Sequence, residues 1–270
     1  MLKQRILTAL ILIPLFLALL FWTPPLGFGL VTLALTLLAA WEWAGLMELK
    51  KTSSRALYVI LITLLLGAAL RISIVTILGV AVFGWIMATF LVVSYPKPYS
   101  FWEKKSKIAR GIMGIFVLIP CWVSLNFIRN VPEGSLILLF LFVLIWGADS
   151  GAYFMGKFFG KKKLLPLVSP GKTWEGFYGA LLTTLVIALI ALTLSEVPSS
   201  MWIGAITLSL VTVLFSIIGD LFESLLKREA GVKDSGRLLP GHGGILDRID
   251  SLTAAAPIFA AGALFLGSRV

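Results

Sequence analysis

The chain has little charge, one cysteine and one histidine, and each shortage excludes a class of protein or site. Only 13% of its residues are Asp, Glu, Lys or Arg, whereas soluble domains carry about a quarter. A soluble globular protein is therefore excluded. Cys121 and His242 are the sole cysteine and histidine, so neither a disulfide within the chain nor a zinc site of Cys and His ligands can form.

What the chain has instead is apolar sequence, which makes up 59% of its 270 residues. The apolar runs are about 20 residues long, the length that crosses a hydrocarbon core roughly 30 Å thick. We therefore predict an all-α, polytopic integral membrane protein that forms a single domain over residues 1–270. The predicted spans, about nine in number, cover residues 6–22, 27–47, 56–70, 72–95, 108–128, 135–156, 174–194, 202–226 and 246–268.

The basic residues predict the orientation of these spans. Counted by alternate loops, 20 of the 23 Lys and Arg residues fall on one side, which the positive-inside rule assigns to the cytoplasm. The N-terminus is then cytoplasmic and the C-terminus external. The first run ends at Thr23-Pro24-Pro25 without a small-residue cleavage site, so we expect a retained helix and no signal peptide. The net charge of +10 then reflects topology, and no nucleic-acid partner is expected.

Polar residues gather between the last two predicted spans, where an apolar chain would not place them by default. Asp220, Glu223, Ser224 and Lys227 have the spacing of one helix face. A glycine-rich loop follows, and such loops let backbone N–H groups approach an anion. Carboxylates, cations and glycines together predict a site for a metal ion and phosphate.

This segment resembles a known family. Residues 224–250 read SLLKREAGVKDSGRLLPGHGGILDRID, and residues 149–176 read DSGAYFMGKFFGKKKLLPLVSPGKTWEG. Both stretches are similar to the signature blocks of the phosphatidate cytidylyltransferase (CDP-diacylglycerol synthase) family, and the first agrees at fifteen or so restricted positions, far more than a short motif provides. The resemblance implies transfer of CMP from CTP to phosphatidate. Residues 141–270 would be the catalytic part, and the resemblance assigns no specific role to the helices of residues 1–95.

The predicted site combines acidic metal ligands with cations and glycines that bind phosphate. The metal is expected to be Mg²⁺, since hard oxygen ligands suit it. Its predicted ligands are Asp220, Asp247, Asp149 and Asp250. The predicted catalytic residues are Asp220, Asp247, Lys227 and Arg248. The predicted substrate-binding residues are Lys172, Ser169, Thr173, Arg228, Lys233, His242, Gly243 and Gly244.

Two of these segments have rival interpretations. Residues 169–173, SPGKT, do not form a P-loop, because Pro166 stands where that motif needs glycine. Thr173 is instead a predicted helix N-cap, and the helix start beside Lys172 also suits an anion. We assign His242 to phosphate contact or loop structure, since a phosphate monoester, with a second pKa of about 6, needs no base to attack.

Two acids, Asp149 and Glu42, lie inside the apolar runs. Asp149 needs a partner, a cation or a water-filled cavity, because an unpaired carboxylate in hydrocarbon is costly. Glu42 is either a functional residue or a helix-end acid that reaches the membrane surface. The aromatic and lysine residues of 94–107 fit an interfacial anchor better than specific capture of phosphatidate.

Other functions remain open at this point. A CTP-using enzyme acting on another lipid, such as a polyprenol kinase or an archaeal-type lipid cytidylyltransferase, shares the substrate, and a transporter also uses acids within the membrane. Against a transporter, the charged residues concentrate on one face. The sequence leaves open whether the chain forms a homodimer. We expect it in the plasma or inner membrane, with the site facing the cytoplasm.

Overall fold

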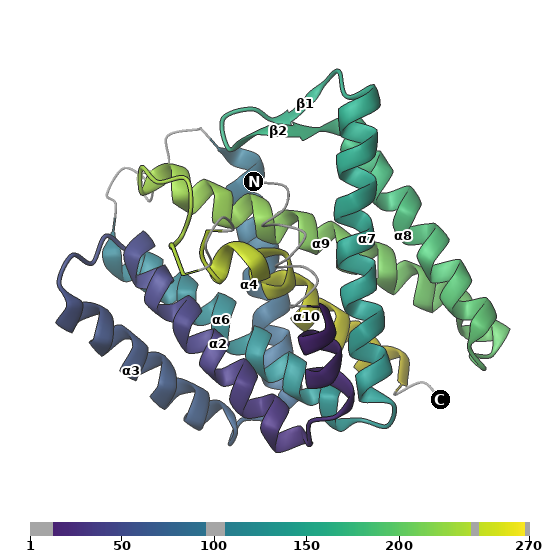
Figure 1. Ribbon diagram of the computed structural model, residues 1–270, viewed down its shortest axis with the longest axis horizontal. Helices are drawn as coiled ribbons and strands as arrows, with labels where there is room; N and C mark the ends of the chain where they lie inside the picture. Colours follow the sequence, from purple (N-terminus) through teal and green to yellow (C-terminus); the bar gives the residue numbers. More distant parts are fainter. Residues whose placement is uncertain (1–12, 96–105, 239–242, 268–270) are drawn as a thin grey trace.

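The computed structural model describes residues 13–95, 106–238 and 243–267, and helices make up nearly all of it (Figure 1). The predicted all-α membrane fold is confirmed, with one small β-hairpin added. The helices are α2 (Pro25–Leu46), α3 (Thr52–Ala69), α4 (Ile74–Ser94), α6 (Lys107–Asn130), α7 (Gly134–Phe159), α8 (Trp174–Leu194), the short 3₁₀ helix η1 (Ser199–Met201), α9 (Trp202–Glu229) and α10 (Leu246–Gly267).

Within the described residues, 8 helices are long and apolar enough to cross a membrane. They correspond to eight of the nine predicted spans. The first predicted span, 6–22, lies partly outside the described residues, and its described part is helical over 13–21. The predicted break at Arg71 is confirmed, since α3 ends at Ala69 and α4 begins at Ile74.

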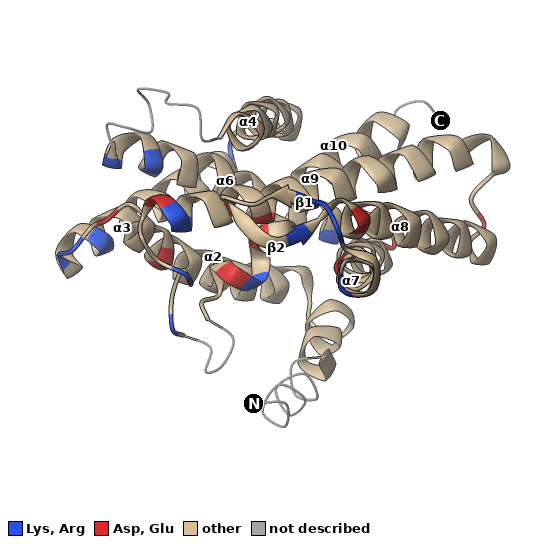
Figure 2. Ribbon diagram, turned by 90° about the horizontal axis from the view of Figure 1, so that it is seen from above, with Lys and Arg blue, Asp and Glu red and all other residues tan. Residues whose placement is uncertain are grey.

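Large apolar side chains cover the outside of the bundle, as lipid contact requires. Leu26, Leu64 and Phe83 are among those most exposed. In water such a surface would be costly, whereas in a bilayer it faces lipid tails. Charged residues, by contrast, occur around β2 and α7 and on and near α2 and α3, and much of α8 and α10 carries none (Figure 2). The chain is an integral membrane protein.

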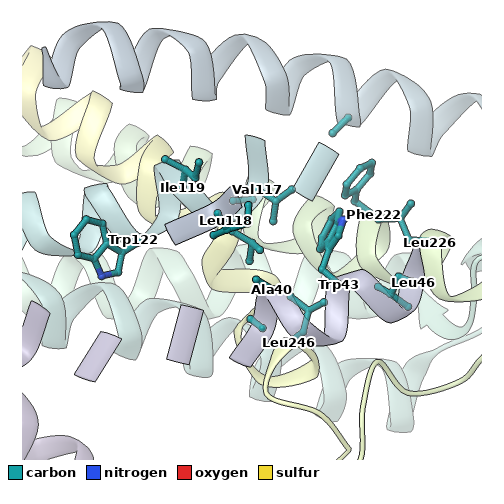
Figure 3. Packing of buried hydrophobic residues seen from close by; sticks show 14 of the residues in the cluster. Ala40, Trp43, Leu46, Val117, Leu118, Ile119, Trp122, Phe222, Leu226 and Leu246 are labelled. Carbon is teal, nitrogen blue, oxygen red and sulfur yellow. The ribbon is translucent and has the colours of Figure 1, made fainter. Parts of the chain in front are cut away.

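One hydrophobic core joins helices from both halves of the chain. Trp43 of α2 lies beside Phe222 of α9, and Ala40 lies near Leu246 of α10 (Figure 3). The same core includes Leu118 of α6. The N-terminal helices therefore pack directly against the two helices that flank the predicted site.

Helices α7 and α8 pack closely through glycines. A Cβ atom added to Gly151 would collide with the side chain of Thr183 and lie 2.8 Å from the carbonyl oxygen of Gly179. A Cβ on Gly147 would meet Ile187. The lack of a side chain at these two glycines therefore lets α7 and α8 approach closely.

A β-hairpin between α7 and α8 was not predicted. Strand β1 (Lys163–Leu165) pairs with β2 (Ser169–Thr173) in antiparallel fashion, with Lys163 opposite Thr173. The hairpin leads directly into α8, whose N-cap is Thr173, as predicted. The Thr173 hydroxyl accepts a hydrogen bond from the N–H of Gly176 at 3.1 Å. This connection places Lys172 next to Asp220 of α9.

Candidate active site

A cavity of about 370 Å³ lies between α7, α8, α9 and the hairpin. Its polar lining includes Asp149 of α7, Lys172 of β2 and Asp220 of α9. Tyr153 and Lys157 also line it. With Thr173, four predicted site residues thus meet at one cavity, and the two lysines there could face an anionic ligand.

The closest contact in the cavity joins Lys172 to Asp220. The Lys172 Nζ atom lies 2.6 Å from Oδ2 of Asp220. The other carboxylate oxygen, Oδ1, accepts a hydrogen bond from the Ser224 hydroxyl at 3.2 Å. Asp149 lies close enough to Lys172 and Asp220 to interact electrostatically with both. The acid in the membrane span therefore has the cavity and the cation that the sequence required of it.

Behind the cavity, Lys227 connects α9 to α10. Its Nζ atom lies 2.7 Å from Oδ1 of Asp247 and 3.1 Å from Oε1 of Glu223. These side chains are largely buried, with 12% of Lys227, 7% of Asp247 and 4% of Glu223 exposed. Oε2 of Glu223 has no hydrogen-bond partner among the described residues. The side chains of the predicted polar stripe on α9 thus take part in this network, and they include Glu223, which is not among the predicted site residues.

Asp247 holds the loop that precedes α10. Its Oδ2 atom accepts hydrogen bonds from the N–H and the hydroxyl of Ser235, both at 2.9 Å, and from the N–H of Gly244 at 2.8 Å. Gly243 has a φ of 84°, and a Cβ there would lie 2.8 Å from this same oxygen. The loop therefore folds back onto α10, and glycine at 243 permits both the backbone angle and the close approach.

Asp250 lies where α9 and α10 cross. A Cβ on Gly219 would lie 2.6 Å from the carbonyl oxygen of Asp250, so the two helices are in contact at this point. The Asp250 carboxylate interacts electrostatically with Asp220, Lys227 and Lys172. It belongs to the same charged cluster, although it does not line the cavity.

The remaining predicted residues are more dispersed. Arg228 donates from Nε to the carbonyl oxygen of Val168 at 3.4 Å, so it supports the hairpin. Thr173 lines the cavity. Ser169 lies at the far end of β2, opposite Leu165. Of the other candidates that the structure describes, Lys233 and Arg248 have exposed side chains that do not line the cavity. His242 lies outside the described residues.

Two residues outside the predicted site, Ser235 and Glu42, have polar contacts within the loop before α10. Ser235 occupies a position at which the signature allows any residue, so nothing in the sequence indicated a role for it. Glu42 was marked as an acid in an apolar run. Its alternative role as a helix-end acid at the membrane surface is wrong, because only 3% of Glu42 is exposed and its carboxylate contacts the loop before α10.

The expected Mg²⁺ needs carboxylates that lie close to one another or to the phosphates. Among the residues described, no three His, Cys, Asp or Glu side chains stand close enough together to hold a metal ion by themselves. Mg²⁺ bound with a nucleotide usually needs only one or two carboxylates, because phosphates and water supply its other ligands. Asp149 and Asp220, which line the cavity, fit this arrangement. Asp247 fits it less well, because its oxygens already accept from Lys227, Ser235 and Gly244.

The chain resembles known proteins over almost its whole length. The family model described as "Cytidylyltransferase family" matches residues 3–266. A phosphatidate cytidylyltransferase of Pseudomonas aeruginosa is 44% identical over 97% of this chain and 96% of its own length. The proteins of that name from Haemophilus influenzae and Brucella suis are 42% and 36% identical, over 96% and 98% of this chain and 97% and 94% of their own lengths.

Proposed function

The chain belongs to the cytidylyltransferase family, and we propose that its activity is that of its curated relatives, phosphatidate cytidylyltransferase. It transfers CMP from CTP to phosphatidate and releases pyrophosphate, so the product is CDP-diacylglycerol. The observation that carries this proposal is the identity of 44% over nearly the full chain. The cavity that joins Lys172 to Asp220 supplies a site with suitable chemistry.

The reaction exchanges one phosphorus–oxygen bond for another. A phosphate oxygen of phosphatidate attacks the α-phosphorus of CTP, and the bond from that phosphorus to the bridging oxygen of the β-phosphate breaks. Pyrophosphate leaves with the electron pair of that bond. The attacking oxygen is already ionised near neutral pH, because the second pKa of a phosphate monoester is about 6, so no side chain has to remove a proton from it.

The residues of the cavity would counter the charge of the triphosphate. Lys172 and Lys157 line it, and fixed cations of this kind stabilise the charge that develops during phosphate transfer. Asp149 and Asp220 would hold Mg²⁺, with Asp250 close behind them. When bound, the ion would neutralise phosphate oxygens and orient the leaving group. A ligand role for Asp247 stays a prediction, and its contacts support a role in holding the loop.

We further propose that the site faces the cytoplasm from the plasma or inner membrane. The hairpin and the segment before α10 belong to the side that carries 20 of the 23 basic residues, and CTP is a cytoplasmic nucleotide. Association of two copies also stays a prediction, which the mass of the purified protein in detergent would check.

An assay of the detergent-purified protein with phosphatidate, Mg²⁺ and labelled CTP tests the function. We expect the label of [α-³²P]CTP to enter the lipid and the label of [γ-³²P]CTP to leave as pyrophosphate. Transfer of the γ-label to a lipid would instead identify a kinase. No transfer of either label, with uptake of a solute into vesicles that contain the protein, would favour a transporter.

A further inference from the structure

Glu42 lies in the last turns of α2, against the helices that carry the site. It is a carboxylate on a membrane-spanning helix, yet only 3% of it is exposed. Its neighbours Ala40 and Trp43 belong to the core shared with Phe222 and Leu246 (Figure 3). Burial of this charge would be costly unless strong hydrogen bonds compensated for it.

Those hydrogen bonds come from the start of α10 and from the loop before it. Oε1 of Glu42 accepts from the N–H of Ile245 at 3.1 Å, and Oε2 accepts from the N–H of Leu246 at 2.8 Å. The first N–H groups of a helix have no acceptor within that helix, and a carboxylate there also interacts favourably with the helix dipole. Glu42 thus caps α10 from another transmembrane helix.

The loop is shaped around this carboxylate. A Cβ atom on Gly236 or on Gly244 would collide with the carboxylate of Glu42. The backbone therefore approaches Glu42 from two positions of the signature, and only glycine leaves room at either. The Ser235 hydroxyl also lies 3.2 Å from Oε2 of Glu42, so its single hydrogen is shared between this oxygen and Oδ2 of Asp247.

Ser235 connects Glu42 to the charged cluster. Its hydroxyl lies 3.2 Å from Oε2 of Glu42 and 2.9 Å from Oδ2 of Asp247. Asp247 in turn contacts Lys227 at 2.7 Å. The loop thus contacts two carboxylates, Glu42 of α2 and Asp247 of α10. Asp247 also pairs with Lys227 of α9.

We propose that Glu42 is a positioning residue for CMP transfer: it fixes Ser235 and the start of α10, and thereby places Asp247 and Lys227. The effect on catalysis depends on the proposed function, whereas the effect on the loop does not. This assigns a task to the N-terminal half of the chain, which the signature blocks do not reach.

The test variant is Glu42→Gln, which preserves size but replaces one acceptor oxygen with an NH₂ group that cannot accept a hydrogen bond. Ile245 or Leu246 then loses its partner. We expect turnover to fall by about tenfold or more, as the loss of a hydrogen bond to a buried charged group implies, with a smaller change in the KM for CTP. Amide hydrogen exchange of residues 243–247 should rise by a similar factor.

The matched control is Glu48→Gln. Glu48 lies just beyond the same helix and pairs with Arg110 at 2.9 Å, whereas Glu42 accepts its hydrogen bonds from the start of α10 and the residue before it. We expect near-wild-type turnover and unchanged exchange at 243–247. If Glu42→Gln retains turnover within about twofold or leaves exchange there unchanged, the proposal is wrong. Equal loss of turnover in both variants would also overturn it, because general loosening of the N-terminal helices would explain both.

A second variant decides the matter if Glu42→Gln cannot be purified. Gly236→Ala keeps Glu42 but pushes a methyl group against its carboxylate, whereas Gly79→Ala places a Cβ where nothing lies within 4 Å. Lower turnover and faster exchange in Gly236→Ala alone support the proposal, and wild-type values in both variants contradict it. If the wild-type protein transfers no CMP at all, the proposed function fails, and hydrogen exchange still tests whether Glu42 holds the loop.

Discussion

Lys172 and Asp220 form an ion pair across the cavity, with Nζ and Oδ2 2.6 Å apart. The pair joins the hairpin before α8 to the first residue of the polar stripe on α9. Both side chains are about a quarter exposed, at 27% and 28%, so the pair is accessible to a ligand and is not a sealed structural contact. An arriving triphosphate would compete with Asp220 for the lysine, and Mg²⁺ would compete with the lysine for Asp220.

We predict that Lys172→Met raises the apparent KM for CTP and lowers turnover. The change removes the cation that faces Asp220 and Asp149, so their negative charge would repel the triphosphate. A loss on the order of 10²-fold in kcat/KM is expected, by comparison with the removal of single stabilising groups in other enzymes. Steady-state kinetics over a range of CTP concentrations would measure it.

Lys161→Met is the matched control for that change. Lys161 lies next to the hairpin and is exposed, so it should contribute to topology alone, and its variant should keep wild-type kinetics. If the Lys172 variant also keeps them, Lys172 is merely one of the positive charges that orient the chain in the membrane.

Asp220→Asn and Asp247→Asn should separate a metal ligand from a loop anchor. Asn removes a ligand charge and nearly preserves volume. For Asp220→Asn we expect a loss of turnover on the order of 10²-fold or more, a need for more Mg²⁺ and retained thermal stability. Asp247→Asn should lower turnover as well, but with faster hydrogen exchange around Ser235 and Gly244, whose N–H groups it binds.

CMP transfer titrated with Mg²⁺ and thermal unfolding in detergent are the measurements. If either variant keeps a rate close to wild type with an unchanged Mg²⁺ dependence, its carboxylate is not a catalytic metal ligand. Low stability with near-normal activity per folded molecule would point to a purely structural role.

The transmembrane spans could be predicted because length and hydropathy determine them locally. The break at Arg71 and the N-cap at Thr173 also follow from neighbouring residues, and both are confirmed. The β-hairpin had no such signal, because residues 163–173 lack the alternation of apolar and polar residues that marks a strand. A pairing within a loop depends on the helices that bring its ends together.

The polar stripe on α9 was predictable for the same local reason, since helical spacing places Glu223 beside Lys227. Which residues meet across helices was not predictable. Nothing in the sequence pairs Lys172 with Asp220, or Glu42 with the N–H of Leu246, because these contacts depend on how the helices pack. The presence of an acid in an apolar run showed only that Glu42 needed partners.

The orientation in the membrane gives a further prediction. A reporter fused after Val270 should lie on the external side, and one inserted between Lys161 and Lys163 should lie in the cytoplasm, because basic loops stay inside. Activity of the two reporters in intact cells measures this. Finding both on the same side would contradict the arrangement of spans and the cytoplasmic site.

The contact between α9 and α10 provides the last prediction, Gly219→Ala. The added Cβ would lie 2.6 Å from the carbonyl oxygen of Asp250 and 3.1 Å from Cβ of Ala254. Neither atom can rotate away, since one is backbone and the other is fixed to it, so the helices must separate.

Separation would move Asp220, the next residue on α9, relative to Asp250. We expect a lower turnover and a stability loss of about 1–3 kcal/mol, typical of overpacking. Gly67→Ala is the control, because nothing lies within 4 Å of its added Cβ and alanine favours helix by about 0.5–1 kcal/mol over glycine. Thermal unfolding and CMP transfer would be measured for both. A Gly219 variant that melts and turns over like the Gly67 variant would show that the spacing of α9 and α10 does not set the geometry of the site.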